Sequence, residues 1–119
     1  MGLLILPQQH WYDNIPETLL MEKDWGISPE NIILNGNEES KNVRNIVRHL
    51  RNSISHYHFH AFNNHNEKIS EVKFEDYDLN NNKTFEATLP VESITNFLHI
   101  FSEYMLNFMD SSIQRNKIN

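Results

Sequence analysis

Arg51, Asn52 and His56 are the residues of this chain whose types and spacing best suit chemistry on a phosphate group. A guanidinium can hold two phosphate oxygens at once and stabilise charge that develops in a transition state. An imidazole gains or loses a proton near neutral pH, so it can serve as a general acid or base. An asparagine amide can orient the histidine or the phosphate by hydrogen bonding. The three residues predict a site for proton transfer at a bound phosphate.

The segment around these residues concentrates positive charge in an otherwise acidic protein. The chain has 16 acidic and 10 basic residues and a net charge of −6, yet no Asp or Glu lies between Ser40 and Asn66, where five of the seven histidines are found. The net charge argues against a protein that coats nucleic acid generally, whereas the local cationic segment favours an encounter with RNA. The RNA contacts that we expect beyond the three residues above are Lys41, Arg44, Arg48, His58 and His60.

RNA carries its own nucleophile, the 2′-hydroxyl, so its cleavage needs proton transfer and charge stabilisation but no metal and no cofactor. The products would be a 2′,3′-cyclic phosphate and a 5′-hydroxyl. The run from His56 to His60 permits a second interpretation, because alternate histidines of an extended segment face the same way and suit zinc or nickel. No cysteine exists to complete such a site, and no carboxylate follows before Glu67. We therefore expect no metal site, and histidines that face RNA or solvent.

A helix from about residue 38 to 55 should carry the three residues. An apolar stripe at helical spacing predicts it, formed by Val43, Ile46, Val47, Leu50, Ile54 and Tyr57, with Asn37 or Ser40 as its cap. On a continuous helix Arg51 and His56 would point about 140° apart. They can reach one phosphate only if the helix ends near Ser55, or if a second subunit closes the site. The spacing alone is equally compatible with a solvated Arg51 and an ordinary histidine at a helix end.

The remaining segments predict a hairpin and a last helix. Residues 69–77 and 84–89 are β-prone and are joined by an asparagine-rich connection, which is typical of a hairpin. Pro90 then begins a helix with an apolar stripe, formed by Ile94, Phe97, Leu98, Phe101, Met105 and Phe108, followed by a polar tail over residues 111–119. Residues 1–36 show little pattern beyond a short helix expected after Pro16. At 119 residues we expect one domain over 1–119.

The stretch from Arg48 to His56, followed by the hairpin and by Phe85 to Glu92 leading into the last helix, resembles the HEPN family, over roughly residues 38–108. The family signature is an arginine, a polar residue and then a histidine, and Arg51, Asn52 and His56 match it. The resemblance implies a mainly α-helical bundle with a β-hairpin inserted before the last long helix, usually as a homodimer. It also implies a metal-independent ribonuclease in toxin–antitoxin, abortive-infection or CRISPR defence. Two departures are Pro90, where a helix-capping Ser is commoner, and residues 1–36, which do not align.

Together these observations predict a metal-independent endoribonuclease of the HEPN type. The alternative is a non-catalytic HEPN-like module that binds RNA, a nucleotide or a protein such as an antitoxin. One motif supplies one histidine, so an acid and a base together suggest two motifs across the two-fold axis of a homodimer. The absence of cysteine favours a cytoplasmic protein, and the apolar run Leu3–Leu6 is too short for a signal peptide or a membrane span.

Overall fold

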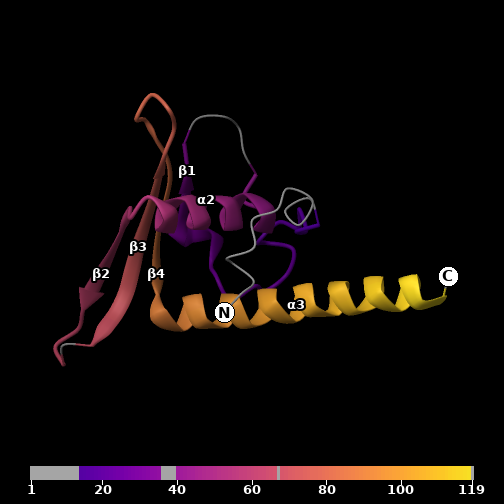
Figure 1. The fold of residues 1–119 in the computed structure, drawn as a ribbon. Helices are drawn as coiled ribbons and strands as arrows, with labels where there is room; N and C mark the ends of the chain where they lie inside the picture. Colours follow the sequence, from indigo (N-terminus) through magenta and orange to yellow (C-terminus); the bar gives the residue numbers. More distant parts are fainter. Residues whose placement is uncertain (1–13, 36–39, 67, 119) are drawn as a thin grey trace.

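The computed structural model describes residues 14–35, 40–66 and 68–118, the last eleven of these as backbone. Figure 1 shows a sheet at one side, with one helix packed beside it and a longer helix leading away from it. The elements in chain order are a 3-10 helix η2 (Pro29–Asn31), β1 (Ile32–Leu34), α2 (Val43–Ser55), β2 (Phe59–Asn63), β3 (Ile69–Tyr77), β4 (Lys83–Pro90) and α3 (Val91–Ile118).

The four strands form one antiparallel sheet in the order β1-β4-β3-β2. Its centre is the hairpin of β3 and β4, which confirms the hairpin expected from the sequence. The turn between them is held by Asp78, whose side chain accepts the backbone N–H groups of Asn80 and Asn82 at 2.9 Å. Asn81 has φ +64°, a left-handed conformation that asparagine tolerates better than most residues. The asparagine-rich connection therefore closes the hairpin as predicted.

The prediction of a mainly α-helical bundle is wrong. The described residues form two α-helices and a four-stranded antiparallel sheet, because each strand of the expected hairpin gains an outer partner. β1 pairs with β4, with Ile32 opposite Ala87, and β2 pairs with β3, with Phe59 opposite Phe74. The hairpin is thus the middle of a sheet rather than an insertion in a bundle.

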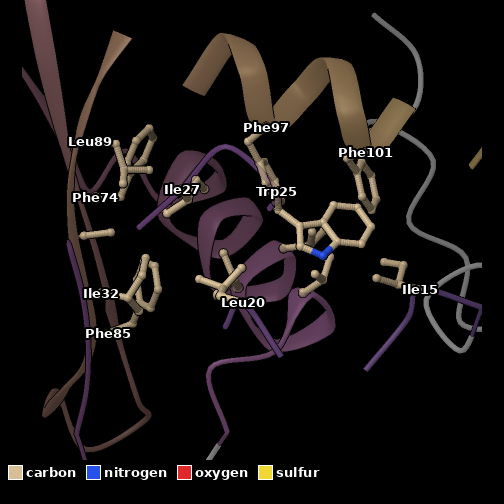
Figure 2. Packing of buried hydrophobic residues seen from close by; sticks show 14 of the residues in the cluster. Ile15, Leu20, Trp25, Ile27, Ile32, Phe74, Phe85, Leu89, Phe97 and Phe101 are labelled. Carbon is tan, nitrogen blue, oxygen red and sulfur yellow. The ribbon is translucent and has the colours of Figure 1, made fainter. Parts of the chain in front are cut away.

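The core lies between one face of the sheet and the two helices (Figure 2). Alternate residues of β4, Phe85, Ala87 and Leu89, are buried on that face, as the two-residue period of a strand requires. Trp25 fills the space beside α3, where its ring lies 6.5 Å from that of Phe97. The other buried apolar residues are Ile15, Leu20, Ile27, Ile32, Val43, Ile46, Val47, Phe74, Phe101 and Met105.

Helix α2 begins at Val43, later than the sequence suggested. Its N-cap is Asn42, whose side chain accepts the N–H of Asn45 at 2.8 Å. The expected caps are wrong for Ser40, which lies before this cap, and outside the described residues for Asn37. At the other end, Ile54 and Tyr57 are 47% and 82% exposed, so the predicted apolar stripe does not continue to Tyr57.

Helix α3 follows β4 without a loop, and its backbone continues through the expected polar tail to Ile118. Of its predicted stripe, Phe97, Phe101 and Met105 are buried, and the side chain of Phe108 lies outside the described residues. No helix in the described part of the chain combines the length and apolarity that a bilayer span needs.

Residues 14–35 pack onto both helices, and the residues after Pro16 do not form the short helix expected there. Leu19 instead forms an isolated bridge with Asn42 at the start of α2. Gly26 has φ +88°, and a Cβ placed there would lie 2.8 Å from the Cβ of Asn96 and 2.9 Å from the backbone nitrogen of Phe97. Only glycine allows the chain to approach α3 this closely.

Candidate functional site

The C-terminal end of α2 is a Schellman motif that turns the chain directly toward β2. His56 is the C-cap, and the N–H of His58 reaches back to the carbonyl of Ser53 at 2.8 Å. Tyr57, between the two histidines, has φ +59°. This left-handed conformation is the one that the motif requires, and residues other than glycine adopt it rarely. The backbone is therefore strained between His56 and His58.

The three predicted catalytic residues lie on either side of this helix end. Arg51 and Asn52 are half-buried within the last turns of α2, whereas His56 is exposed at the C-cap. The sequence left two ways for Arg51 and His56 to serve one phosphate, either a helix that ends near Ser55 or a second subunit that closes the site. In the structure α2 ends at Ser55. The catalytic roles of the three residues stay a prediction.

Asn52 is held against the sheet by Asp76 of β3. Its Nδ2 donates to Asp76 Oδ2 at 3.2 Å, and the same oxygen lies 2.8 Å from Nδ1 of His49. The His49 and Asp76 side chains are only 2% and 7% exposed. The ring of His49 stacks on that of Phe85, 4.8 Å away and nearly parallel. From the sequence, Asn52 was expected to orient His56 or the phosphate. In the structure its side-chain amide instead donates a hydrogen bond to the buried carboxylate of Asp76.

The proton positions in this buried group follow from its chemistry. A carboxylate oxygen only accepts hydrogen bonds, so Nδ1 of His49 carries a proton and donates it to Asp76. Nε2 of the same ring lies 3.5 Å from Nη2 of Arg48, which can only donate. The neutral tautomer with its proton on Nδ1 satisfies both neighbours. The buried group thus fastens the second half of α2 to β3.

His49 and Asp76 are the structurally important polar residues that the sequence analysis missed. A signal for them existed, because His49 is three residues after Ile46 and therefore lies near the buried face of the helix. Asp76 is two residues after Phe74 and so points to the core face of its strand. A histidine and an acid that both point to the core need partners, and each is the other's partner.

Two of the expected RNA contacts serve the fold at the opposite end of α2. Lys41 donates to the carbonyl of Pro29 at 2.9 Å. Arg44 donates through Nε to the carbonyl of Ile15 at 2.9 Å and forms a 2.6 Å ion pair with Glu17. At 1.5 Å per residue, Arg44 lies about 17 Å along the axis from Ser55, the last residue of the helix. The cationic residues are thus spread along α2 and do not converge on one point.

His58 and His60 lie beyond the helix end, next to β3. The ring of His58 is 6.2 Å from that of His56 and makes an edge-to-face contact with Tyr77 at 5.0 Å. Its Nδ1 is buried and has no hydrogen-bond partner among the described residues. His60 is mostly exposed, and its Nε2 lies 3.8 Å from Oε1 of Glu75. The structure therefore brings His58, rather than His60, next to His56.

A charged cluster covers the face of the sheet away from the helices. Lys83 lies 2.5 Å from Glu75 and 2.9 Å from Glu86. The hydrogen bond from Lys83 holds the pKa of the Glu75 carboxyl below its usual range, in spite of partial burial. Hydrogen bonds to Glu75 and then Glu86 raise the pKa of the Lys83 ammonium above its usual range. These charges satisfy one another and bind the two central strands together.

Among the described residues, no group of three or more His, Cys, Asp or Glu side chains is arranged to hold a metal ion. The expectation that no metal takes part stays a prediction. A shallow depression is lined by parts of residues 20–29 and by Ser93 and Asn96 of α3. None of Arg51, Asn52 and His56 lines this depression.

Comparison with known proteins gives one match. The model of the family described as HEPN pEK499 p136 matches residues 1–112, nearly the whole chain and including the N-terminal segment that the sequence motif left unassigned. No curated protein and no solved structure matches. The match confirms the HEPN resemblance that rested on Arg51, Asn52 and His56. The chain belongs to the HEPN pEK499 p136 family.

Proposed function

We propose that this protein is a metal-independent endoribonuclease that cleaves RNA by attack of the 2′-hydroxyl on the adjacent phosphate. The observation that carries the proposal is the end of α2 in a chain of a HEPN family, where the helix stops between Arg51 and His56. Arg51 holds a non-bridging phosphate oxygen and stabilises the charge of the transition state. His56 transfers a proton, a role worth about 10²–10⁴-fold in rate.

Asn52 has a positioning role in this proposal. Its amide is bound to Asp76, so it fixes the turn of α2 from which Arg51 projects relative to β3. Preorganisation of this kind matters because small displacements of a charged donor from the phosphate reduce its effect on the transition state. Arg48 and His60 are proposed to guide the RNA backbone. Arg44 in the first turn of α2 and Lys41 just before the helix are proposed to add positive charge along the same path, besides their contacts with the N-terminal segment. The same proposal includes a cytoplasmic role in bacterial defence or as a toxin.

The test is cleavage of single-stranded and structured RNA by the purified protein, with and without EDTA. Arg51→Ala and His56→Ala should each lose cleavage while retaining wild-type helical content by circular dichroism. His99→Ala is the matched control, since His99 is an exposed histidine on α3 that pairs with Glu103 at 3.4 Å. Wild-type cleavage rates in either site variant would refute the assignment. Loss of cleavage in EDTA, restored by a stoichiometric metal, would refute the metal-independent mechanism.

A second candidate function is a non-catalytic module that binds a protein, and the exposed edge of the sheet favours it. β2 is an outer strand with all five residues exposed, and Phe59 and Phe62 are 40% and 43% exposed. It has no Lys or Pro of the kind that protects natural sheet edges. A partner such as an antitoxin, or a second copy of this chain, could add a strand there.

Light scattering tests the second copy. A homodimer would give about twice the chain mass of 14.2 kDa at micromolar concentration, and Phe62→Lys should return the protein to a monomer if β2 is the interface. RNA cleavage by wild type would favour the first function whatever the oligomeric state.

A further inference from the structure

The imidazole rings of His56 and His58, both from one chain, lie close together. Their ring centroids are 6.2 Å apart, with the ring planes tilted by 33°. The left-handed Tyr57 stands between them, and strain of this kind persists only where the surrounding structure holds the backbone in place. The chain around His58 is fixed, because its carbonyl accepts the hydroxyl of Ser53 at 2.7 Å and the N–H of Glu75 at 2.9 Å. The backbone at His58 is therefore held in place close to His56.

The side chain of His58 lacks the hydrogen bond that a purely structural histidine would have. Its Nδ1 is buried without a partner among the described residues, and an unpaired buried polar atom costs free energy and needs an explanation. The edge-to-face contact with the ring of Tyr77 orients the His58 ring but gives its Nδ1 no conventional hydrogen-bond partner. Since Nδ1 is buried, His58 can exchange a proton with a substrate only through Nε2.

The cleavage reaction needs two proton-transfer groups on opposite sides of one phosphorus atom. As the 2′-oxygen bonds to phosphorus, it gives its proton to a neutral imidazole. As the bond from phosphorus to the 5′-oxygen breaks, that oxygen takes a proton from an imidazolium. Each nitrogen must lie about 2.6–3.2 Å from its oxygen. Two rings 6.2 Å apart can flank one phosphate in this way.

We infer that His58 is the second proton-transfer group of the site, acting together with His56 of the same chain. The inference rests on the proposed ribonuclease function and adds a catalytic residue to it. From the sequence, the second histidine was expected to come from a second subunit, because each motif has only one. The turn at Tyr57 supplies it within the subunit, so each chain carries a complete acid and base.

Other titratable groups lie around the pair and would contribute to its pH dependence. On β3, Tyr77 contacts the His58 ring and donates its hydroxyl to Glu75 at 3.3 Å. His60 of β2 lies 3.8 Å from the same carboxylate. Arg51 is the cation of the motif on α2. A bell-shaped dependence of kcat on pH is assigned to the histidine pair only if a substitution in the pair removes one limb.

The decisive variant is His58→Phe, which keeps an aromatic ring against Tyr77 but cannot carry a proton. With single-stranded RNA as substrate, kcat should fall about 10²–10⁴-fold, with KM within a few-fold of wild type, and one limb of the pH profile should disappear. The control His99→Ala should retain both limbs. Wild-type kcat and both limbs in His58→Phe would overturn the inference while leaving the proposed function intact. No cleavage by the wild type would overturn both.

Mixing two inactive chains separates action within one chain from action across a dimer. Equal amounts of His56→Ala and His58→Phe should show no recovery of activity, because no chain holds both imidazoles. Recovery on mixing would overturn the inference and return the second histidine to a partner subunit.

If His58→Phe does not fold, wild-type protein provides the test. On titration with a 2′-deoxy dinucleotide, which binds but cannot react, the imidazole ¹⁵N signals of both His56 and His58 should shift together. A shift of His56 alone would overturn the inference.

Discussion

Asp76→Asn, which replaces one carboxylate oxygen by an NH₂ group, should destabilise the protein because Asp76 is buried and hydrogen-bonded. The carboxylate accepts three hydrogen bonds, from His49 at 2.8 Å, from Asn52 at 3.2 Å and from the N–H of Tyr77 at 2.9 Å. An amide in its place must point its NH₂ at one or more of these donors, whichever way it turns. One charge-assisted hydrogen bond is lost, at about 1.5–3 kcal/mol, and the others weaken. We expect a total loss of about 2–4 kcal/mol, which is large against a typical stability of about 5–15 kcal/mol.

The measurement is urea unfolding at pH 7, followed by circular dichroism and by tryptophan fluorescence, to which the buried Trp25 contributes. The midpoint should fall with the slope unchanged, which marks a loss of stability rather than a change of the unfolded state. Glu103→Gln is the control, because its ion pair with His99 is exposed and should be worth less than about 1 kcal/mol. If Asp76→Asn unfolds within about 0.5 kcal/mol of wild type, Asp76 does not hold α2 on the sheet, and the reasoning about Asn52 fails with it.

Three further predictions concern the backbone and the charged face. Tyr57→Gly should raise stability by about 0.5–1 kcal/mol in the same urea assay, because the relief of left-handed strain at φ +59° outweighs the greater entropy of glycine in the unfolded chain. A loss of stability would show that the tyrosine ring contributes more than the strain. Gly26→Ala should lose about 1–3 kcal/mol, since its Cβ would lie 2.9 Å from the backbone of Phe97, and an unchanged midpoint would contradict the close packing against α3. Because the pKa of Glu75 is lower in the folded protein than its unfolded value of 4.5, this carboxylate stabilises the fold above pH 4.5 and does so less as the pH falls through the folded pKa. The urea midpoints of wild type and Glu75→Gln should therefore differ at pH 7 and converge in acid. A difference at pH 7 that persists unchanged in acid would contradict the role of Glu75. The raised pKa of Lys83 has the opposite effect, because its stabilisation is complete below pH 10.5 and is lost as the pH rises through the folded pKa.

The elements with strong periodicity could be predicted from the sequence. The stripe from Val43 to Leu50 gave α2, and the stripe from Ile94 to Met105 gave α3, because helix faces buried against a core need apolar residues three and four apart. The hairpin of β3 and β4 was also predictable, since its alternation and its asparagine-rich turn agree with each other.

The two outer strands could not be predicted, and they change the fold class. β1 has three residues, too few to show a period, and its partner in β4 is about fifty residues away in sequence. β2 is exposed on both faces, so no burial pattern marks Phe59 to Asn63 as a strand. Without these strands, a hairpin beside two helices suggested a helical bundle.

The candidate site was only partly accessible from sequence. Arg51, Asn52 and His56 followed from residue type and spacing. The closeness of His58 to His56 did not, because it depends on a left-handed Tyr57, and sequence rules reserve that conformation for glycine or asparagine. Asp76 was within reach of the two-residue period of β3, and its partner His49 was within reach of the helical period of α2.

The long separation of β1 from β4 has a consequence for the order of folding. Ile32 pairs with Ala87 across 55 residues, whereas Phe74 pairs with the same alanine across 13. Closing the longer loop costs roughly 1.2 kcal/mol more in chain entropy, at about 0.6 kcal/mol for each doubling of length. We therefore expect α2 and the three strands after it to assemble first, and β1 to join last and to detach first in native-state hydrogen exchange. Arg51, His56 and His58 all belong to the part that forms early, so a molecule whose first strand has come loose would still present the site intact.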